Sequence, residues 1–482
     1  MWQIIETMKQ RIVGRKDEIA ILDKVTESSR SEFVAIYGRR RVGKTYLVRE
    51  YYDNKFAFHC SGLSKSNTKA QLQNFNVTLQ RYSSKPVRKS RNWLEAFDRL
   101  IDILEASSDK RKIVFLDELP WMDTPRSNFI PALEHFWNDW ASGRRDVVLV
   151  VCGSATSWMM DKLINNKGGL HNRLTNRILV QPFTLLECEA YFASRKIKLS
   201  RYQIAECYMI MGGIPYYLDY IDKAYSLNEN IDRLFFRPQG QMRTEFENLY
   251  SALFKNSDKY MKVVELLSKK AKGLSREELA SVKKGKSGAD LTKILSNLEK
   301  CGFIRSYRAF GQKTRNKLYQ LIDPYTLFYF QFIHSEEYDD QNYWTHSMLS
   351  AERNAWAGYS FEMLCLNHQE QIKKALGVSG IMTKVSSWRA KTSDKNKKGA
   401  QIDLVIDRKD GYINICEMKF YKKEFSITRE YYSKLEDRLD TFIEETKTRK
   451  AILLTFITSY GLTTNEYSDI VQKSLTLEDL FV

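Results

Sequence analysis

The sequence predicts a multidomain α/β protein, and three observations lead to that prediction. The 482 residues are enough for about three domains of roughly 150 residues each. Short apolar runs alternate with longer stretches of helical pattern over the first 190 residues, which is typical of a parallel sheet covered by helices. Hydrophobic residues make up 43% of the chain and charged residues 28%, so a disordered or fibrous protein is excluded.

Four short apolar runs are the predicted strands of the first domain, at residues 33–37, 113–116, 147–151 and 178–180. Residues 44–52 and 93–104 have a helical pattern. We therefore expect residues 1–190 to form an α/β core. The pattern then turns helical around Gly212-Gly213-Ile214-Pro215, which predicts a helical domain at residues 191–254.

Residues 255–322 predict a third domain of a different kind. Helices are expected at residues 260–269, after the capping box Ser275-Arg276-Glu277-Glu278, and at residues 287–300. The last of these helices carries Leu291, Ile294, Leu295 and Leu298 on one face. Two alternating segments, 303–308 and 316–322, then predict a hairpin. Three helices and a hairpin are typical of a winged helix-turn-helix, and residues 323–482 remain as a fourth domain.

The turn after the first predicted strand carries a phosphate-binding motif. Its sequence is Gly38-Arg39-Arg40-Arg41-Val42-Gly43-Lys44-Thr45, which fits GxxxxGK[ST] between a strand and a helix. The glycines Gly38 and Gly43 let backbone N–H groups surround phosphate oxygens at a helix N-terminus. Lys44 would reach the β- and γ-phosphates and Thr45 would hold Mg²⁺. The motif therefore predicts ATP and Mg²⁺ as cofactors.

Two acids end the second predicted strand. Asp117 lies where a carboxylate reaches the metal from the edge of a parallel sheet, and we expect it to do so through water. Glu118 is the candidate general base that orients the attacking water. Ser154 ends the third predicted strand, and the sequence leaves open whether it senses the γ-phosphate or is a turn residue.

The segment Val13-Gly14-Arg15-Lys16-Asp17-Glu18, the P-loop, the Leu116-Asp117-Glu118 strand end and the Gly212–Pro215 turn together resemble a known family. They are similar to the archaeal-type ATPases, prokaryotic members of the AAA-related STAND class. The resemblance implies an AAA-type P-loop core with a parallel sheet and a helical lid. It also implies that Gly14 and Arg15 lie beside the adenine and that Pro215 contacts the nucleotide from the lid.

The same resemblance points to an arginine after the third strand. The segment Leu170-His171-Asn172-Arg173-Leu174-Thr175 is similar to the one that carries this arginine, although the family usually has Gly where this chain has Asn172. Arg173 is then a candidate arginine finger, acting in cis or on a neighbouring subunit of a homo-oligomer. An ordinary surface arginine is the alternative, and Arg177 is a rival for the role.

A second chemical signature lies near the C-terminus. Residues 401–407 and 412–420 alternate like two strands joined by a turn, so Glu417 and Lys419 share one face and Asp403 can be brought alongside. Two acids would bind Mg²⁺ through oxygen, and Lys419 would orient the water or offset charge on the phosphate. This combination meets the requirements of metal-assisted phosphodiester hydrolysis.

The arrangement resembles the PD-(D/E)xK nuclease superfamily, whose members have a restriction-endonuclease-like α/β domain. The resemblance adds Glu362 as a further acid from a helix and Gln401 as a frequent neighbour. A helix at residues 426–447 and a strand at 451–455 complete the expected order. No Pro precedes Asp403, and an amphipathic hairpin with solvated charges is the structural alternative.

Basic residues outnumber acidic ones by 76 to 59, a formal charge of +17 that makes nucleic acid, and DNA first, a candidate partner. We expect residues 383–398 to form a lysine-rich loop facing the phosphate backbone, although a merely solvated loop is the alternative. Within it, Trp388 would either stack or pack. The helix at residues 287–300 would either enter a major groove or serve as a packing element.

No apolar run approaches the roughly 20 residues that span a bilayer, and the N-terminus lacks the pattern of a signal peptide. The seven cysteines are scattered and form no CxxC pair, which argues against a disulfide framework or a structural zinc site. We therefore expect a cytoplasmic protein without membrane contact.

Three functional hypotheses follow. The first is an ATP-dependent enzyme that docks on DNA through a winged helix and hydrolyses phosphodiesters at its C-terminal site. The second is a nucleotide-switched DNA-binding regulator or scaffold whose nuclease-like domain does not cut. The third is an ATPase that remodels proteins, for which the sequence has no specific feature; a protein partner is compatible with any of the three.

Overall fold

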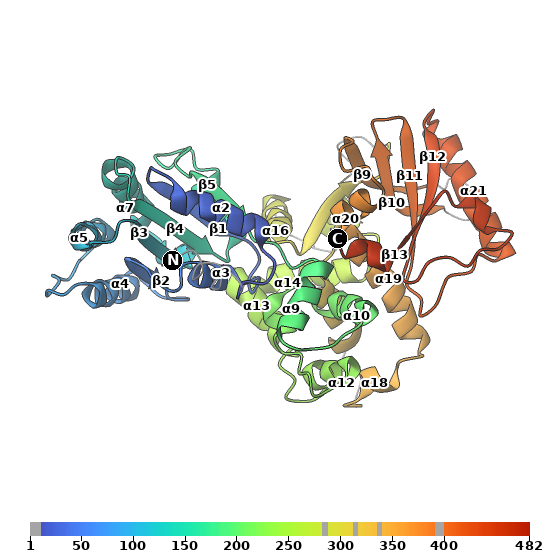
Figure 1. Ribbon diagram of the computed structural model, residues 1–482, viewed down its shortest axis with the longest axis horizontal. Coiled ribbons are helices and arrows are strands. Elements are labelled where there is room, and N and C mark those ends of the chain that lie inside the picture. Colours follow the sequence, from blue (N-terminus) through green and yellow to red (C-terminus); the bar gives the residue numbers. More distant parts are fainter. Residues whose placement is uncertain (1–10, 282–287, 312–316, 335–339, 391–399) are drawn as a thin grey trace. The chain divides into compact units, whose positions relative to one another are not determined.

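The computed structural model describes residues 11–281, 288–311, 317–334, 340–390 and 400–482 (Figure 1). The chain divides into two compact units, Met1–Pro182 and Phe183–Val482.

The first unit is built on a five-stranded parallel sheet with the strand order β2-β3-β4-β1-β5. The strands are β1 (Glu32–Tyr37), β2 (Phe58–Ser61), β3 (Lys112–Asp117), β4 (Val147–Gly153) and β5 (Asn176–Leu179). The four strands expected from sequence are present, and β2 is an additional one at the edge. The α/β core with a parallel sheet is therefore confirmed.

Helices follow the strands in the order expected of such a core (Figure 1). They are α2 (Lys16–Glu27), α3 (Lys44–Tyr51), α4 (Thr68–Tyr82), α5 (Trp93–Ala106), α6 (Leu119–Met122), α7 (Phe129–His135) and α8 (Thr156–Trp158), with short π-helical turns after α7 and α8. Asn67 and Asn92 cap α4 and α5 by accepting backbone N–H groups of the first turn, which explains where these helices begin.

The core of this unit lies between the sheet and α4, α5 and α7. Alternate residues of the strands face it, including Phe33 and Ala35 on β1 and Val114 and Leu116 on β3. The residues between them, such as Val34 and Phe115, are also fully buried. Because both faces of the sheet are covered, its strands are continuous apolar runs rather than alternating ones.

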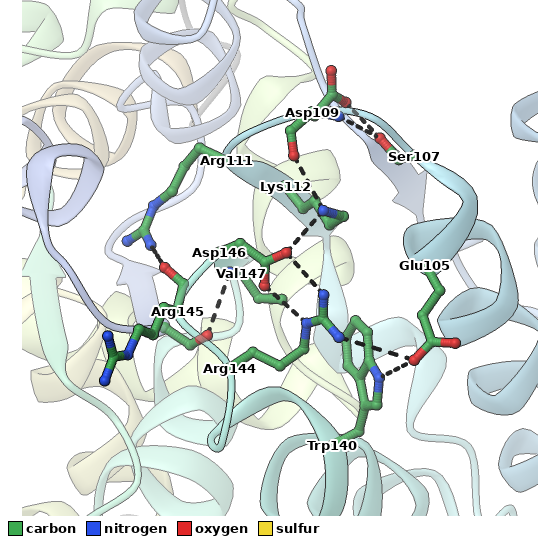
Figure 2. A network of polar contacts seen from close by, with 11 residues as sticks. Glu105, Ser107, Asp109, Arg111, Lys112, Trp140, Arg144, Arg145, Asp146 and Val147 are labelled. Atoms are coloured by element: carbon green, nitrogen blue, oxygen red, sulfur yellow. Dashed lines mark hydrogen bonds and ion pairs between the residues drawn. The ribbon is translucent and has the colours of Figure 1, made fainter.

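A polar network fastens the amino ends of β3 and β4 to each other (Figure 2). Lys112 donates to Asp146 Oδ2 at 2.8 Å, and Arg144 donates to both carboxylate oxygens of Asp146 at 2.8 and 2.9 Å. Arg111 reaches the carbonyl oxygen of Arg145 at 2.6 Å. Hydrogen bonds from Arg144 and Lys112 lower the pKa of Asp146. This network lies at the end of the sheet opposite the P-loop, so its role is structural.

The second unit begins with helices that match the expected helical region. They are α9 (Leu185–Ser194), α10 (Arg201–Met211), α11 (Pro215–Leu218), α12 (Leu227–Ile231) and α13 (Glu245–Leu253). Capping boxes at Thr184, Ser200 and Ser226 begin α9, α10 and α12.

Next comes the segment for which three helices and a hairpin were expected. Its elements are α14 (Ser257–Ser268), β6 (Leu274–Ser275), α15 (Arg276–Ser281), α16 (Gly288–Lys300), β7 (Ile304–Arg308) and β8 (Lys317–Leu321). The strands pair antiparallel in the order β6-β8-β7. The expected apolar face of α16 is buried, with Leu291, Ile294, Leu295 and Leu298 each at most 6% exposed. Lys283, Lys284 and Lys286 lie outside the described residues.

The C-terminal part contains a second, mixed sheet with the order β13-β12-β11-β10-β9. Its elements are α17 (Pro324–Phe328), α18 (Tyr343–His346), α19 (Ala351–Asn367), α20 (Gln369–Ala375), β9 (Thr383–Arg389), β10 (Gln401–Arg408), β11 (Tyr412–Lys419), α21 (Arg429–Thr446), β12 (Ala451–Thr458) and β13 (Lys473–Thr476). Strand β10 runs antiparallel to its neighbours β9 and β11, whereas β12 and β13 run parallel to β11.

The expected loop at residues 383–398 is wrong in its first half, because Thr383–Arg389 forms strand β9 and pairs with β10. Trp388 is 3% exposed and packs edge-on against Phe442, with ring centroids 5.1 Å apart. It is a core residue and does not present a stacking surface. Residues 391–399, with four of the predicted lysines and arginines, lie outside the described residues.

The parts of the second unit are joined by direct contacts. Helix α10 packs against α17 and α19. Arg353 Nη2 on α19 donates to Glu206 Oε1 on α10 at 2.7 Å, and the backbone N–H of Leu185 donates to His368 Nε2 at 3.1 Å. The backbone N–H of Phe310 donates to the carbonyl oxygen of Ser387 at 2.6 Å, which joins the hairpin segment to β9.

Two further expectations concern cysteines and membranes. All seven cysteines are free and buried, as the absence of a disulfide framework requires. None of the helices among the described residues combines the length and the apolar character needed to cross a bilayer.

Candidate functional site

The P-loop occupies the turn between β1 and α3, where its two glycines have positive φ angles that residues with a Cβ rarely adopt. Gly38 has φ 145° and Gly43 has φ 91°, both in the region that favours glycine. A Cβ on Gly38 would lie 2.3 Å from the carbonyl oxygen of Val180, so a side chain there would collide with the backbone after β5. The two glycines are therefore required by the shape of the loop.

Lys44 lies inside this loop and is only 5% exposed. Its ammonium donates to the carbonyl oxygens of Gly38 at 3.0 Å and Arg39 at 2.8 Å. Burial lowers the pKa of Lys44, and the nearby carboxylates of Asp117 and Glu118 oppose that shift. A buried cation held on backbone carbonyls at a helix N-terminus is well placed to receive phosphate oxygens.

Thr45 and Asp117 meet as the predicted magnesium pair. Thr45 Oγ1 donates to Asp117 Oδ2 at 3.0 Å, and Asp117 is 5% exposed at the carboxyl end of β3. A hydroxyl and a carboxylate in contact offer oxygen ligands, which Mg²⁺ prefers. The residues present thus fit the metal that the motif implies.

Glu118 is held in a particular position beside them. Its backbone is left-handed, with φ 47°, and its carboxylate accepts hydrogen bonds from the hydroxyl of Ser154 and, at 3.2 Å, from the backbone N–H of Ser154. Ser154 directly follows β4 and is 6% exposed. The hydrogen bonds to the candidate base bring Ser154 to this site and are compatible with both roles, a γ-phosphate sensor and a turn residue.

Gly14 and Arg15 lie at the start of α2, and both have positive φ, 67° and 57°. The guanidinium of Arg15 is buried against the P-loop, where Nη2 donates to the carbonyl oxygen of Val42 at 2.9 Å. Gly14 and Arg15 are thus placed beside the P-loop residues.

Arg173 and Arg177 are not brought into this cluster by any described contact. Both are exposed, Arg173 in the turn before β5 and Arg177 on β5. Asn172 has φ 56°, a conformation that glycine accepts and asparagine tolerates better than most residues. Pro215 is the first residue of α11 in the second unit and follows Gly212, which has φ 62°.

The second predicted site forms on the mixed sheet. Leu404 pairs with Cys416, so Asp403 and Glu417 occupy the next position on the neighbouring strands β10 and β11. Lys419 Nζ lies 2.8 Å from Glu417 Oε1. Glu362 on α19 is close enough to interact electrostatically with Asp403, Glu417 and Lys419. The four predicted residues therefore lie in one place.

The surroundings shift the pKa values of the acids in this cluster in different directions. Burial raises the pKa of Glu362 to about 8, and the charge of Asp403 adds to the effect. Burial also raises the pKa of Asp403, although the hydrogen bond from Gln401 opposes it. Burial acts in the same direction on Glu417, but Lys419 and Arg438 outweigh it and lower the pKa of Glu417. Crowded carboxyl groups of this kind are stabilised when a cation joins them.

One observation on this cluster favours Mg²⁺ binding, and two others do not. Gln401 Oε1 is buried and has no hydrogen-bond partner among the described residues, as an oxygen ligand awaiting a cation would be. Within the same described ranges, however, no three His, Cys, Asp or Glu side chains are grouped closely enough to hold a metal. Glu417 instead bonds Lys419, Tyr431 and Arg438.

Sequence reasoning missed several residues around this cluster. Tyr431 and Arg438 on α21 bond Glu417, and their separation of seven residues, two helical turns, is the signal that could have found them. Lys272, which precedes β6, interacts electrostatically with Glu362 and Asp403. No local pattern could have identified Lys272, because it comes from a different part of the chain.

The geometry of the first site agrees with a comparison against known families. The model of an ATPase domain predominantly from Archaea matches residues 12–221. Residues 12–221 thus match an archaeal-type ATPase domain. The match includes the P-loop, Asp117, Glu118 and Ser154 and extends to the turn at Pro215. The chain is therefore an ATP-binding P-loop ATPase, which confirms the coarse part of the sequence prediction.

Two curated proteins from one archaeal organism are similar to this chain. The uncharacterized protein MJECL04 of Methanocaldococcus jannaschii is 24% identical over 398 residues, which cover 82% of this chain and 83% of the relative. The uncharacterized ATP-binding protein MJ0423 of the same organism is 40% identical over 43 residues, 9% of this chain and 73% of the relative.

Among solved structures, the chain is similar to the Walker-type ATPase PABY2304 of Pyrococcus abyssi, with a TM-score of 0.51. The two are 18% identical, and the similarity covers 67% of this chain and 97% of the other. At this identity the likeness concerns the fold alone.

Proposed function

We propose that this protein is an ATPase that acts on nucleic acid, with DNA as the first candidate, and that its C-terminal sheet carries a Mg²⁺-dependent phosphodiesterase site. The observation that carries the proposal is the meeting of Glu362, Asp403, Glu417 and Lys419 within one cluster. On this proposal, one strongly basic chain carries two separate sites for phosphate chemistry.

At the nucleotide site, the residues divide the work of ATP hydrolysis. Backbone N–H groups of the P-loop bind phosphate oxygens, and Lys44 leaves its carbonyl partners to neutralise charge on the β- and γ-phosphates. Thr45 and Asp117 would hold Mg²⁺, which supplies Lewis-acid polarisation of the phosphates when bound. Glu118, once released from Ser154, orients the attacking water. Arg173 is a candidate to stabilise the leaving phosphates from a neighbouring subunit, because it is exposed.

At the C-terminal site, Asp403 and Glu417 would hold Mg²⁺, with Glu362 as the additional acid. The metal would supply a nucleophile and a charge clamp for the phosphodiester. Lys419 is held 2.8 Å from Glu417, so it is placed to orient water or to offset charge on the phosphate. For a metal to bind, Glu417 would exchange a cationic partner, Lys419 or Arg438, for it.

The segment at residues 257–321 supports a nucleic-acid substrate. We interpret its three helices and three-stranded sheet as a winged helix-turn-helix. Lys272 and Arg305 from this segment interact electrostatically with Asp403. Cations that face the acid cluster from this segment would bind the phosphate backbone beside the bond to be cut.

The proposal is tested by incubating the protein with Mg²⁺, with and without ATP, and with single- and double-stranded DNA and RNA. Asp403→Asn should lower the rate of cleavage about 10²-fold or more, because a carboxylate that would bind the metal is removed. Asp407→Asn is the matched control, since Asp407 lies on the same strand but pairs with Lys450. Absence of cleavage by the unchanged protein on every substrate would reject the nuclease part and leave the ATPase part standing.

One observation favours the second function, a nucleotide-switched regulator or scaffold that binds DNA without cutting it. Glu417 is already bonded by Lys419, Tyr431 and Arg438, which is an arrangement that needs no metal. Salt-dependent DNA binding that Asp403→Asn leaves unchanged, without metal-dependent cleavage, would select this alternative.

A further inference from the structure

Arg15 makes contacts that its predicted place beside the adenine does not explain. The side chain is almost completely buried, and its two terminal nitrogens point to different parts of the chain. Nη2 donates to the carbonyl oxygen of Val42 at 2.9 Å, while Nη1 donates to the carbonyl oxygen of Gln181 at 2.6 Å. Glu18 also lies near Nη1, at 3.4 Å. The guanidinium therefore bridges the P-loop and the segment that follows β5.

The bond to Val42 has a direct consequence for phosphate binding. The peptide that joins Val42 to Gly43 is planar and trans, so its C=O and N–H point in opposite directions. Arg15 fixes the carbonyl oxygen and thereby aims the N–H of Gly43 away from itself. Gly43, with φ 91°, is the residue directly before Lys44 and one of those whose N–H groups the motif offers to phosphate.

The other end of the P-loop is attached to the same segment after β5. The backbone N–H of Val180 donates to the carbonyl oxygen of Tyr37 at 2.8 Å. Gly38 approaches Val180 so closely that a Cβ would lie 2.3 Å from its carbonyl oxygen. Residues 180–181 thus contact the P-loop at its start directly and near its end through Arg15.

The same segment continues into the second unit, which begins at Phe183. Within that unit, the backbone N–H of Phe183 donates to the carbonyl oxygen of Gly213 at 2.6 Å. A Cβ on Gly213 would lie 1.9 Å from the carbonyl oxygen of Phe183, so the two backbones are in close contact. Four consecutive residues therefore bind the P-loop at one end and the Gly212–Pro215 turn at the other.

We propose that Arg15 is a positioning residue for the P-loop, and that it couples phosphate binding to residues 180–183 rather than contacting the adenine. The guanidinium holds the Val42–Gly43 peptide in its phosphate-binding orientation and uses Gln181 as its anchor. Occupation of the P-loop then restrains residues 180–181, and through the chain the Phe183–Gly213 pairing. The proposal rests on the ATPase domain alone and is independent of the C-terminal site.

The first test compares Arg15→Lys with the unchanged full-length protein. Lysine keeps the positive charge but lacks the planar fork that serves two carbonyls at once. We expect the Kd of ATP to rise about tenfold, as for loss of one charge-assisted hydrogen bond, with kcat at saturating ATP within about twofold. The affinity for inorganic tripolyphosphate, which has no adenine, should fall by the same factor. Glu18→Gln is the control, because it removes the acid beside Arg15 and leaves both carbonyl bonds in place.

If Arg15 contacts the adenine, the result should differ: the affinity for ATP should fall in Arg15→Lys, and the affinity for tripolyphosphate should not. That outcome, or an unchanged ATP affinity in Arg15→Lys, would overturn the proposal.

The second test needs no variant and measures amide hydrogen exchange with and without AMP-PNP and Mg²⁺. The amides of Val180 and Phe183 should exchange at least about tenfold more slowly when the nucleotide is bound. Protection confined to the P-loop, with none at residues 178–183, would show that no coupling exists.

Discussion

The sharpest prediction about stability concerns Asp146, whose carboxylate fastens the amino ends of β3 and β4 (Figure 2). Asp146→Asn keeps the shape of the side chain and removes its charge. Lys112 then remains with its side chain only 8% exposed and without the carboxylate that lies 2.8 Å away. Asp146 is itself 24% exposed, and Lys112 keeps the carbonyl oxygen of Asp109 at 3.1 Å, so losing this partly buried pair costs about 2 kcal/mol, between the values for exposed and buried pairs. Arg144 is 32% exposed, so its share adds at most about 1 kcal/mol.

We therefore expect Asp146→Asn to lower the free energy of unfolding of the first unit by about 2 to 3 kcal/mol at pH 7. Urea denaturation followed by circular dichroism measures this loss, and ATP affinity below the transition should be unchanged because the P-loop lies at the other end of the sheet. Asp139→Asn is the control, since the Asp139 side chain is 73% exposed and should change stability by less than about 0.5 kcal/mol. A loss below about 1 kcal/mol for Asp146→Asn would refute the reasoning.

The pH dependence of that difference follows from the sign of the shift. The pKa of Asp146 is lowered in the fold from the 3.8 of a free carboxyl, so its contribution is fully present above that value. The contribution declines only as the pH falls through the lowered pKa. The difference between the two proteins should thus be constant from pH 8 to pH 5 and shrink in stronger acid. A difference that shrinks between pH 8 and pH 5 would mean that another group is responsible.

The remaining predictions concern the ATPase reaction. Lys44→Ala should abolish measurable ATP binding in calorimetry, because the buried ammonium is the cation on the phosphates, and retained affinity would contradict its role. Glu118→Gln should keep ATP affinity while turnover falls about 10²- to 10⁴-fold; equal loss of both would indicate a structural role instead. Arg173→Ala should lower turnover only at protein concentrations where chains associate, and an effect on isolated chains would place the residue in cis.

Much of the first unit could be predicted because its signals are local. An apolar run of five residues followed by GxxxxGK[ST] can be recognised as a strand, a turn and a helix from its own residues. Asp117 and Glu118 could be proposed for the same reason, since Asp117 ends a buried strand and Glu118 directly follows it. Strand β2 was missed because Phe58–Ser61 is short and its residues are only alternately buried, which is a weak signal.

The second unit shows where local signals stop. The pairing of Glu417 with Lys419 could be predicted, because both lie on one strand at a spacing of two. Trp388 could not be assigned, because the same sequence permits a loop or a strand, and only pairing with β10 and packing on Phe442 decided between them.

The sequence by itself therefore determined which residue types stand together at each candidate site, through fixed spacings along one strand or turn. The tertiary structure decided which partners those residues have. Tyr431 and Arg438 reach Glu417 from a helix, Lys272 reaches Asp403 from the hairpin segment, and Arg15 bridges two carbonyls 139 residues apart in the chain, as 181 minus 42 gives. The physical reason is that covalent spacing fixes neighbours within a few residues, whereas charge pairing and burial depend on how distant segments pack.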